Sequence, residues 1–191
     1  MVIHDAYCRC HSLPYFVHEK HGFPHLFSDS ITCLDVSDHE ILVGSADSRC
    51  YLYDLRQGLL TSDYLGSPVS SARLSHDGQC VLVGTMGDQR VRLIDKHSGE
   101  LLNEYQGHKN LNYKLESSFA PGDAQVVSGS EDGRLVIWDL IEAKLLASLP
   151  HPLPGRSVHS VDVHPEQYLL VTAQEGQAFM WGPRDFAEEV G

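Results

Sequence analysis

The chain has 191 residues, a length that suits one domain or at most two. Hydrophobic residues make up 42% of it and charged residues 21%, a balance that supports a folded core and argues against wholesale disorder. The formal net charge of −12 repels phosphate backbones and anionic lipid, so neither nucleic acid nor a membrane is expected as a direct partner.

The first thirty residues carry no repeat pattern and are interpreted as a divergent, partly disordered lead-in. They lack the basic-then-apolar layout of a signal peptide, and the chain has no apolar run of about 18 residues, which favours the cytoplasm, with the nucleus as a second location. The alternative is a zinc site, but Cys-x-Cys is a shorter gap than structural zinc sites use. We therefore expect no metal, and a lead-in in which residues 24–27 add an outer strand to the first sheet. The residues that would form this zinc site are Cys8, Cys10, His11, His18, His21 and His25.

From residue 31 onward, four similar segments follow one another. Each ends in an aromatic or apolar residue followed by Asp or Gly, and these endings recur every 41 to 44 residues: Tyr53-Asp54, Ile94-Asp95, Trp138-Asp139 and Trp181-Gly182. An acidic residue stands seven positions before each final residue: Asp47, Asp88, Asp132 and Glu175. A period of roughly 40–45 residues with such an ending is typical of propeller blades.

Alternating β-branched strands flank each acidic turn, and a further polar turn precedes them. Each segment therefore predicts a four-stranded antiparallel blade, and the chain as a whole predicts an all-β fold. The expected blades are residues 31–65, 69–105, 114–149 and 158–182, before an acidic tail at 183–191. The last blade should lack its outer strand, because Gly182-Pro183 breaks the pattern. The cysteines at 33, 50 and 80 are expected to act as small apolar strand residues.

The third segment resembles the repeat of WD-repeat β-propellers, through Gly107-His108, Asp132 and Trp138. That resemblance implies a buried, hydrogen-bonded relay formed by His108, Ser128 or Ser130, Asp132 and Trp138. The alternative, a catalytic triad, is rejected, because the repeat register accounts for these residues and no Gly-x-Ser-x-Gly elbow is present. We expect no catalytic residues and no cofactor. The other blades replace one or more of these residues and should rely more on packing.

Several stretches resemble WD-repeat scaffolds of the mitogen-activated (ERK-type) kinase cascade, a group also associated with spliceosomes. The resemblance covers residues 31–182 and implies a non-catalytic protein-interaction scaffold whose partners are kinase-cascade proteins. The alternatives are a spliceosome component in mRNA splicing and, from another class, a metal-dependent enzyme. The stretches are 36–56, 78–80, 93–96, 99–102, 105–110 and 130–133.

Two sets of residues are candidates for binding partners. Lys109, Tyr113, Arg134 and Arg156 lie near strand starts that should share one rim of a propeller, and Tyr and Arg are preferred interface anchors. Arg56, in Tyr53-Asp54-Leu55-Arg56, resembles the Trp-Asp-x-Arg box through which ubiquitin-ligase substrate receptors meet an adaptor. The alternative for Arg56 is a surface residue that ends a strand.

Four blades are fewer than the seven of the scaffolds that this chain resembles, so we expect an incomplete or open arc. The sequence leaves open a ring closed by four blades, a ring completed by other chains, and a truncated form. An open arc exposes two apolar blade faces, which predicts self-association. The expected faces are Ile31, Leu34, Leu42 and Leu52 at the first end, and Val161, Val163, Leu170 and Phe179 at the last.

Overall fold

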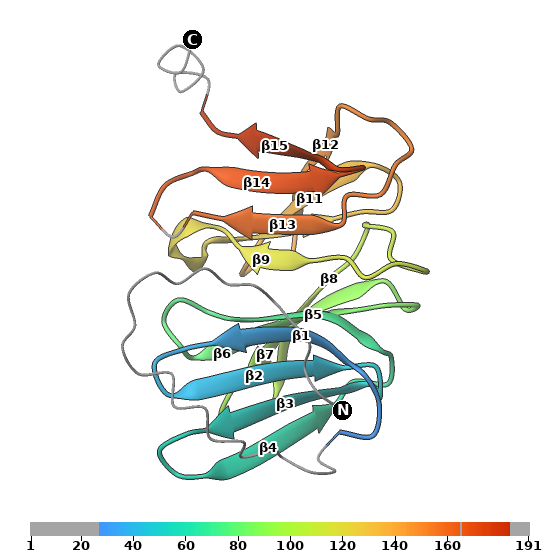
Figure 1. The fold of residues 1–191 in the computed structure, drawn as a ribbon. Coiled ribbons are helices and arrows are strands. Elements are labelled where there is room, and N and C mark those ends of the chain that lie inside the picture. Colours follow the sequence, from blue (N-terminus) through green and yellow to red (C-terminus); the bar gives the residue numbers. More distant parts are fainter. Residues whose placement is uncertain (1–26, 165, 184–191) are drawn as a thin grey trace, which may run out of the picture.

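A computed structural model describes residues 27–164 and 166–183 of the chain. Within these ranges the fold is all-β, with fifteen strands and one short 3-10 turn, η1 (Pro121–Asp123). No helix in this part of the chain is long and apolar enough to cross a membrane. The strands form four separate antiparallel sheets that follow one another in chain order, as the sequence predicts for a propeller (Figure 1).

Each sheet is built from consecutive strands, so every blade is a simple meander. Blade 1 contains β1 (Ile31–Val36), β2 (Glu40–Ser45), β3 (Arg49–Asp54) and β4 (Leu59–Tyr64). Blade 2 contains β5 (Val69–Leu74), β6 (Cys80–Thr85), β7 (Arg90–Asp95) and β8 (Leu101–Tyr105). Blade 3 contains β9 (Ser117–Phe119), β10 (Gln125–Gly129), β11 (Arg134–Asp139) and β12 (Leu145–Pro150). Blade 4, in the part of the chain described, contains β13 (Ser160–Val163), β14 (Leu170–Gln174) and β15 (Gln177–Trp181).

The aspartate that ends the third strand of blades 1, 2 and 3 turns the chain into the fourth strand. One carboxylate oxygen of Asp54 accepts the backbone N–H groups of Arg56 and Gln57. Asp95 and Asp139 make the same pair of bonds in blades 2 and 3. This is an Asx turn, in which the side chain replaces a backbone acceptor. Gly182, which follows β15, has no side chain and cannot make this turn.

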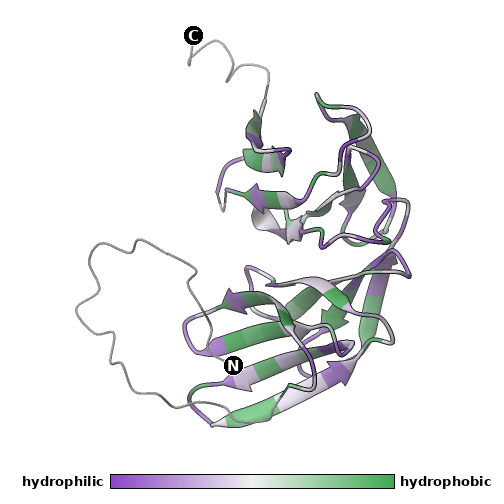
Figure 2. Cartoon of the chain, turned by 45° about the vertical axis from the view of Figure 1, so that its right-hand side comes forward, coloured by the Kyte–Doolittle hydropathy of each residue, from purple (hydrophilic) through white to green (hydrophobic). Residues whose placement is uncertain are grey.

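Apolar clusters join each blade to the next. One cluster lies between blades 1 and 2 and includes Leu42, Val69 and Val81. A second lies between blades 2 and 3 around Leu82 and Trp138, and a third between blades 3 and 4 around Val127 and Val161. The innermost strands β1, β5, β9 and β13 are in contact in that order, so the sheets follow an arc (Figure 2).

The exposed end faces of this arc agree with the predicted ones only in part. Leu34 lies on the free face of blade 1 as predicted, together with Val36, whereas Leu42 and Leu52 pack against blade 2. At the other end, the predicted residues Val161, Val163 and Leu170 pack against blade 3, and the free face carries Val171 and Met180. Phe179 pairs with the fully buried Thr172 and stacks edge-on against His151, so it too lies on the covered side. The alternation of side chains along a strand shows which residues share a face, but not which face meets the neighbouring blade.

The described end of the lead-in contacts blade 1. Phe27 stacks edge-to-face on Tyr51 with ring centroids 4.9 Å apart. The cysteine and histidine cluster of residues 8–25 and most of the expected outer strand at 24–27 lie outside the described residues. Cys33, Cys50 and Cys80 are free thiols on strands, and burial raises the pKa of all three.

Candidate protein-interaction rim

The starts of the third strands and the loops between blades meet along one edge of the arc. The N–H of Glu131 donates to the carbonyl of Lys109 at 2.9 Å, which ties the loop from blade 2 to the turn of blade 3. The N–H groups of Val158 and His151 donate to Ser130 and Gly133, which ties the loop into blade 4 to the same turn. We call this connected surface, residues 106–114, 130–134 and 151–158, the interaction rim.

The Glu131 carboxylate organises the rim. Its Oε1 accepts three successive backbone N–H groups, from Leu111 at 2.8 Å, Asn112 at 2.5 Å and Tyr113 at 3.0 Å. Burial opposes ionisation of Glu131, but these donors outweigh it and hold the pKa of the carboxyl below its ordinary value. The loop is therefore fixed by a charged side chain that the sequence analysis did not single out.

The four predicted rim residues all lie on this surface, and all are exposed. The Tyr113 ring stacks edge-on against His159, with centroids 5.6 Å apart. Arg134 lies 3.7 Å from Asp132, and Arg156 lies 3.7 Å from Glu175. Exposed pairs of this kind are weak, so both guanidinium groups remain available to a partner.

Arg56 lies elsewhere. It is in the turn between β3 and β4, at the end of the third strand opposite to the rim, and is exposed. Its N–H bonds to Asp54, and its side chain is 3.9 Å from the same carboxylate. These contacts belong to the turn itself.

The predicted relay of blade 3 is not formed as a chain of hydrogen bonds. Trp138 is fully buried, but its indole N–H donates to the carbonyl of Gln106 at 2.9 Å rather than to a serine. The hydroxyl of Ser128 donates to the Gly129 carbonyl. Neither ring nitrogen of His108 has a hydrogen-bond partner among the described residues. A backbone carbonyl in the loop satisfies the indole, so the histidine is left to pack edge-on against the Trp138 ring at 5.6 Å.

The two remaining relay candidates face the rim. The hydroxyl of Ser130 accepts the N–H of Lys109 at 2.9 Å, and the exposed Asp132 pairs with Arg134. Both therefore shape the loop surface instead of continuing a buried network. Burial lowers the pKa of His108 to about 4, so this ring is neutral near pH 7.

Blade 4 contains the hydrogen-bonded relay instead. The Thr172 hydroxyl accepts the indole N–H of Trp181 at 2.9 Å and lies 2.8 Å from Nε2 of His151. Next to them, the buried Gln174 amide donates to the carbonyls of Leu153 and Arg156 and so fixes the loop of the rim. The sequence carried a signal for this histidine, because His151 precedes Trp181 by 30 residues, as His108 precedes Trp138.

Blades 1 and 2, which are expected to rely more on packing, also have polar contacts at the acidic turn. The acid of each turn binds the residue four positions later. Asp47 accepts the hydroxyl of Tyr51 at 2.8 Å, and Asp88 accepts Arg92 at 2.5 Å. Arg92 also donates to the Thr85 hydroxyl at 2.8 Å.

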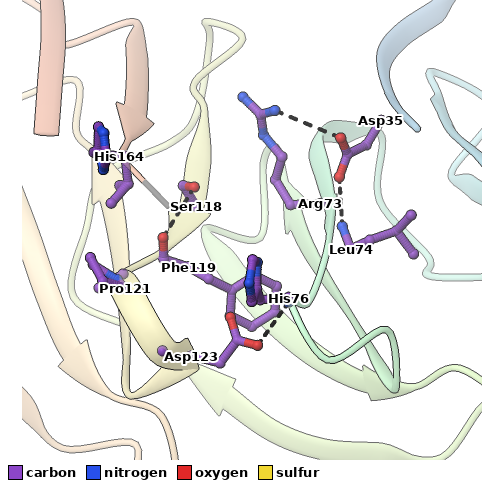
Figure 3. A pocket seen from close by; sticks show the side chains of 12 residues that line it. Asp35, Arg73, Leu74, His76, Ser118, Phe119, Pro121, Asp123 and His164 are labelled. Carbon is purple, nitrogen blue, oxygen red and sulfur yellow. Dashed lines mark hydrogen bonds and ion pairs between the residues drawn. The ribbon is translucent and has the colours of Figure 1, made fainter. Parts of the chain in front are cut away.

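A hollow of about 170 Å³ lies at the opposite ends of the inner strands (Figure 3). Its carboxylates are engaged across blades: Asp35 accepts the N–H of Leu74 at 2.7 Å, and Asp123 accepts the N–H of His76 at 2.7 Å. Arg73 lies 3.9 Å from Asp35. These groups fasten neighbouring blades together, and none of the predicted rim residues lines the hollow. Among the described residues, no group of three or more His, Cys, Asp or Glu side chains suits a metal ion.

Repeated antiparallel blades, apolar packing between them and the buried Trp at the end of the third strand together define a WD-repeat protein. The family model for the WD domain, G-beta repeat, matches residues 18–54 and 99–139.

Among curated proteins, the chain is similar to WD repeat domain-containing protein 83. It is 46% identical to the Rattus norvegicus protein over 163 residues, which cover 85% of this chain and 51% of that protein. It is 36% identical over 136 residues to the Dictyostelium discoideum homolog, covering 70% of this chain and 40% of the homolog. The chain thus spans about half the length of the curated relatives it matches.

Two solved structures share the fold. The crystal structure of RRP9 WD40 repeats has a TM-score of 0.71 at 20% identity and covers 83% of this chain and 49% of that one. The structure of U3-55K has a TM-score of 0.72 at 20% identity, covering 83% of this chain and 50% of that one.

Proposed function

We propose that this chain is a non-catalytic scaffold that binds other proteins through the interaction rim. The observation that supports this most is the fixed loop around Glu131, which presents exposed side chains on a rigid surface. A surface that is already ordered binds with a smaller loss of conformational entropy. The hydrogen bonds of Gln174 order the neighbouring loop in the same way.

The exposed chemistry of the rim suits an acidic segment of a partner. Lys109, Arg134 and Arg156 supply positive charge on a chain whose overall charge is −12. Tyr113 adds a rigid aromatic contact beside them. The acids Asp132 and Glu175 pair with the two arginines only in exposed positions, so a partner carboxylate can replace them.

The proposed partners are components of the mitogen-activated (ERK-type) kinase cascade. This part of the proposal rests on the resemblance of residues 31–182 to mitogen-activated protein kinase organizer 1. It implies that the chain acts in signal transduction in the cytoplasm, with the nucleus as a second location. Spliceosome components are the competing partners, and the experiment distinguishes the two.

The test is capture of partners from cell extract on the immobilised chain, with separate detection of kinase-cascade and splicing proteins. Lys109→Ala combined with Arg134→Ala is expected to weaken capture of the kinase-cascade proteins at least about tenfold, and raised salt to weaken it further. Lys144→Ala is the matched control, because Lys144 is exposed in the turn at the opposite end of blade 3. Capture of splicing proteins alone, or equal loss in the control, would contradict the proposal.

A further inference from the structure

Blades 1 and 2 leave a cavity between their outer halves, which we call the outer slot. Its volume is about 20 Å³, which is room for one group of the size of a water molecule. Its walls are mostly apolar, and none of its lining residues belongs to the interaction rim. The lining residues are Leu42, Cys50, Leu52, Thr61 and Asp63 of blade 1, and Val81, Val83, Ile94 and Lys96 of blade 2.

The corresponding place between blades 2 and 3 is filled by an aromatic ring. Asp63 is paired with Cys50 of the third strand, and Tyr105 is paired with Val91 at the same register of blade 2. Tyr105 is fully buried, and its hydroxyl donates to the carbonyl of Leu140 in the turn of blade 3 at 2.6 Å. The side chain of Asp63 is too short to fill the same space, so the outer slot stays open.

Asp63 brings a negative charge to the slot. Among the described residues its carboxylate has neither a hydrogen bond nor an ion pair, and burial raises the pKa of this carboxyl above its ordinary value. Its Oδ1 lies 3.2 Å from the place of a Cβ atom on Gly99, so the carboxylate points toward blade 2. The Lys96 ammonium also lines the slot, but it is already paired with Glu40 at 3.0 Å. The slot therefore has one carboxylate to which the described chain supplies no counter-charge.

Two exposed leucines flank the mouth of the slot. Leu59 precedes Thr61 and Asp63 by two and four positions on β4, so it shares their face. Leu101, on β8, is paired with Ile94 of the slot wall. The two leucines are 54% and 51% exposed. An apolar mouth beside a carboxylate suits a side chain with an apolar stem and a positive end.

We propose that the outer slot binds a lysine side chain of a partner protein, in a segment with apolar residues beside that lysine. The ammonium donates to the Asp63 carboxylate and to the Thr61 hydroxyl, which donates its own hydrogen to the Leu52 carbonyl. The methylene stem lies along the leucines of the mouth. A guanidinium is planar and larger than this cavity, and a partner carboxylate would be repelled by Asp63. The slot thus selects a chemistry opposite to that of the rim.

The test is an NMR titration of the isotope-labelled full chain with the peptide acetyl-Leu-Lys-Leu-amide. We expect saturable shifts in the amide signals of Leu52, Thr61 and Ile94, while the signals of the rim stay in place. The same peptide with norleucine instead of lysine keeps the apolar stem but lacks the charge. It should bind at least about tenfold more weakly, because it cannot form the charged hydrogen bond.

Two substitutions at position 63 separate charge from space. Asp63→Asn removes the charge and should weaken binding of the lysine peptide at least about tenfold. Asp63→Tyr fills the slot as Tyr105 does between blades 2 and 3, and should abolish binding while the far-UV circular dichroism spectrum stays unchanged. Asp38→Asn is the matched control and should bind normally, because Asp38 is an exposed acid of the same blade that does not line the slot.

Four results would each overturn the proposal. They are equal binding of the lysine and norleucine peptides, binding that persists in Asp63→Tyr, an equal loss in Asp38→Asn and Asp63→Asn, and no saturable shift at about 10 mM lysine peptide. Shifts confined to the rim would also contradict it, because they would place the basic peptide on the wrong surface.

Discussion

Trp138 and Trp181 occupy the same place in consecutive blades, yet their indole N–H groups bond to different partners. Trp181 bonds to the Thr172 hydroxyl, which also meets His151, whereas Trp138 bonds to the Gln106 carbonyl. A buried indole needs an acceptor, and either kind satisfies it. The Thr172 hydroxyl should therefore contribute more to the free energy of unfolding than the Ser128 hydroxyl.

Thr172→Val is expected to lower the free energy of unfolding by about 1–3 kcal/mol, because it leaves the Trp181 indole and the His151 ring without their shared partner. Ser128→Ala is the control at the same register in blade 3 and should cost less than about 1 kcal/mol, because the Ser128 hydroxyl bonds only to the carbonyl of Gly129. Urea unfolding of both variants is the measurement. A larger loss of unfolding free energy for Ser128→Ala than for Thr172→Val would show that the hydrogen-bonded relay lies in blade 3.

His108 makes stability depend on pH. Its folded-state pKa is lowered from 6.5 to about 4 by burial, so the unfolded chain binds more protons than the folded one between these values. This contribution is present in full above pH 6.5 and is lost as the pH falls toward 4, for a total of roughly 3 kcal/mol.

Chemical unfolding at several pH values between 4.5 and 6.5 measures this effect. His108→Gln should flatten the slope, and the part that remains should come from His151, whose pKa burial also lowers. An unchanged slope in the variant would show that His108 is charged in the folded state.

Among the strands, the glycines at one register of the second strand show how closely the blades approach. A Cβ atom at Gly129 would overlap the carbonyl oxygen of Val158, in the loop that enters blade 4, and one at Gly44 would overlap Val69 of blade 2. At Gly84 the closest atom is the Ser71 hydroxyl oxygen of the same blade, and Ser117 of blade 3 lies 3.3 Å away. Ala173 has the same register in blade 4, and no described blade covers its face. The pattern explains why these strands contain Val-Gly or Ser-Gly pairs although glycine weakens a strand.

Gly129→Ala is expected to destabilise the fold by about 1–3 kcal/mol through this overlap, because a backbone carbonyl cannot move aside as a flexible side chain does. Ala173→Gly is the matched control and should change the free energy of unfolding by less than about 1 kcal/mol, the ordinary cost of glycine in a strand. Thermal or urea unfolding distinguishes the two. Equal effects would mean that blades 3 and 4 are not in close contact.

On the scale of the whole molecule, the apolar clusters join each blade to its neighbours in the chain, so stability should be greatest where a blade is covered on both faces. Blades 2 and 3 meet this condition. Blade 4 has one covered face and, among the described residues, three strands.

Amide hydrogen exchange should therefore be slowest in β6 and β10, the second strands of blades 2 and 3, and at least about tenfold faster in β15 at the edge of blade 4. Mass spectrometry of exchanged peptides measures this difference. Uniform protection across the four blades would indicate one fully closed and cooperative ring.

The sequence alone determined the blade pattern, because the acidic turns and the Asp that ends the third strand of blades 1, 2 and 3 recur with a fixed period and act through local hydrogen bonds. It also predicted that Lys109, Tyr113, Arg134 and Arg156 share one rim, since the direction of each strand follows from its place in the meander.

Tertiary structure alone decided the relay, the role of Glu131 and the end faces of the arc. Whether an indole meets a hydroxyl or a carbonyl depends on a loop far away in the chain, as Gln106 shows for Trp138. Leu34 and Leu42 are both apolar strand residues, and only the position of blade 2 buries one and exposes the other. Local patterns fix which side chains share a face, while the contacts between blades fix which face is covered.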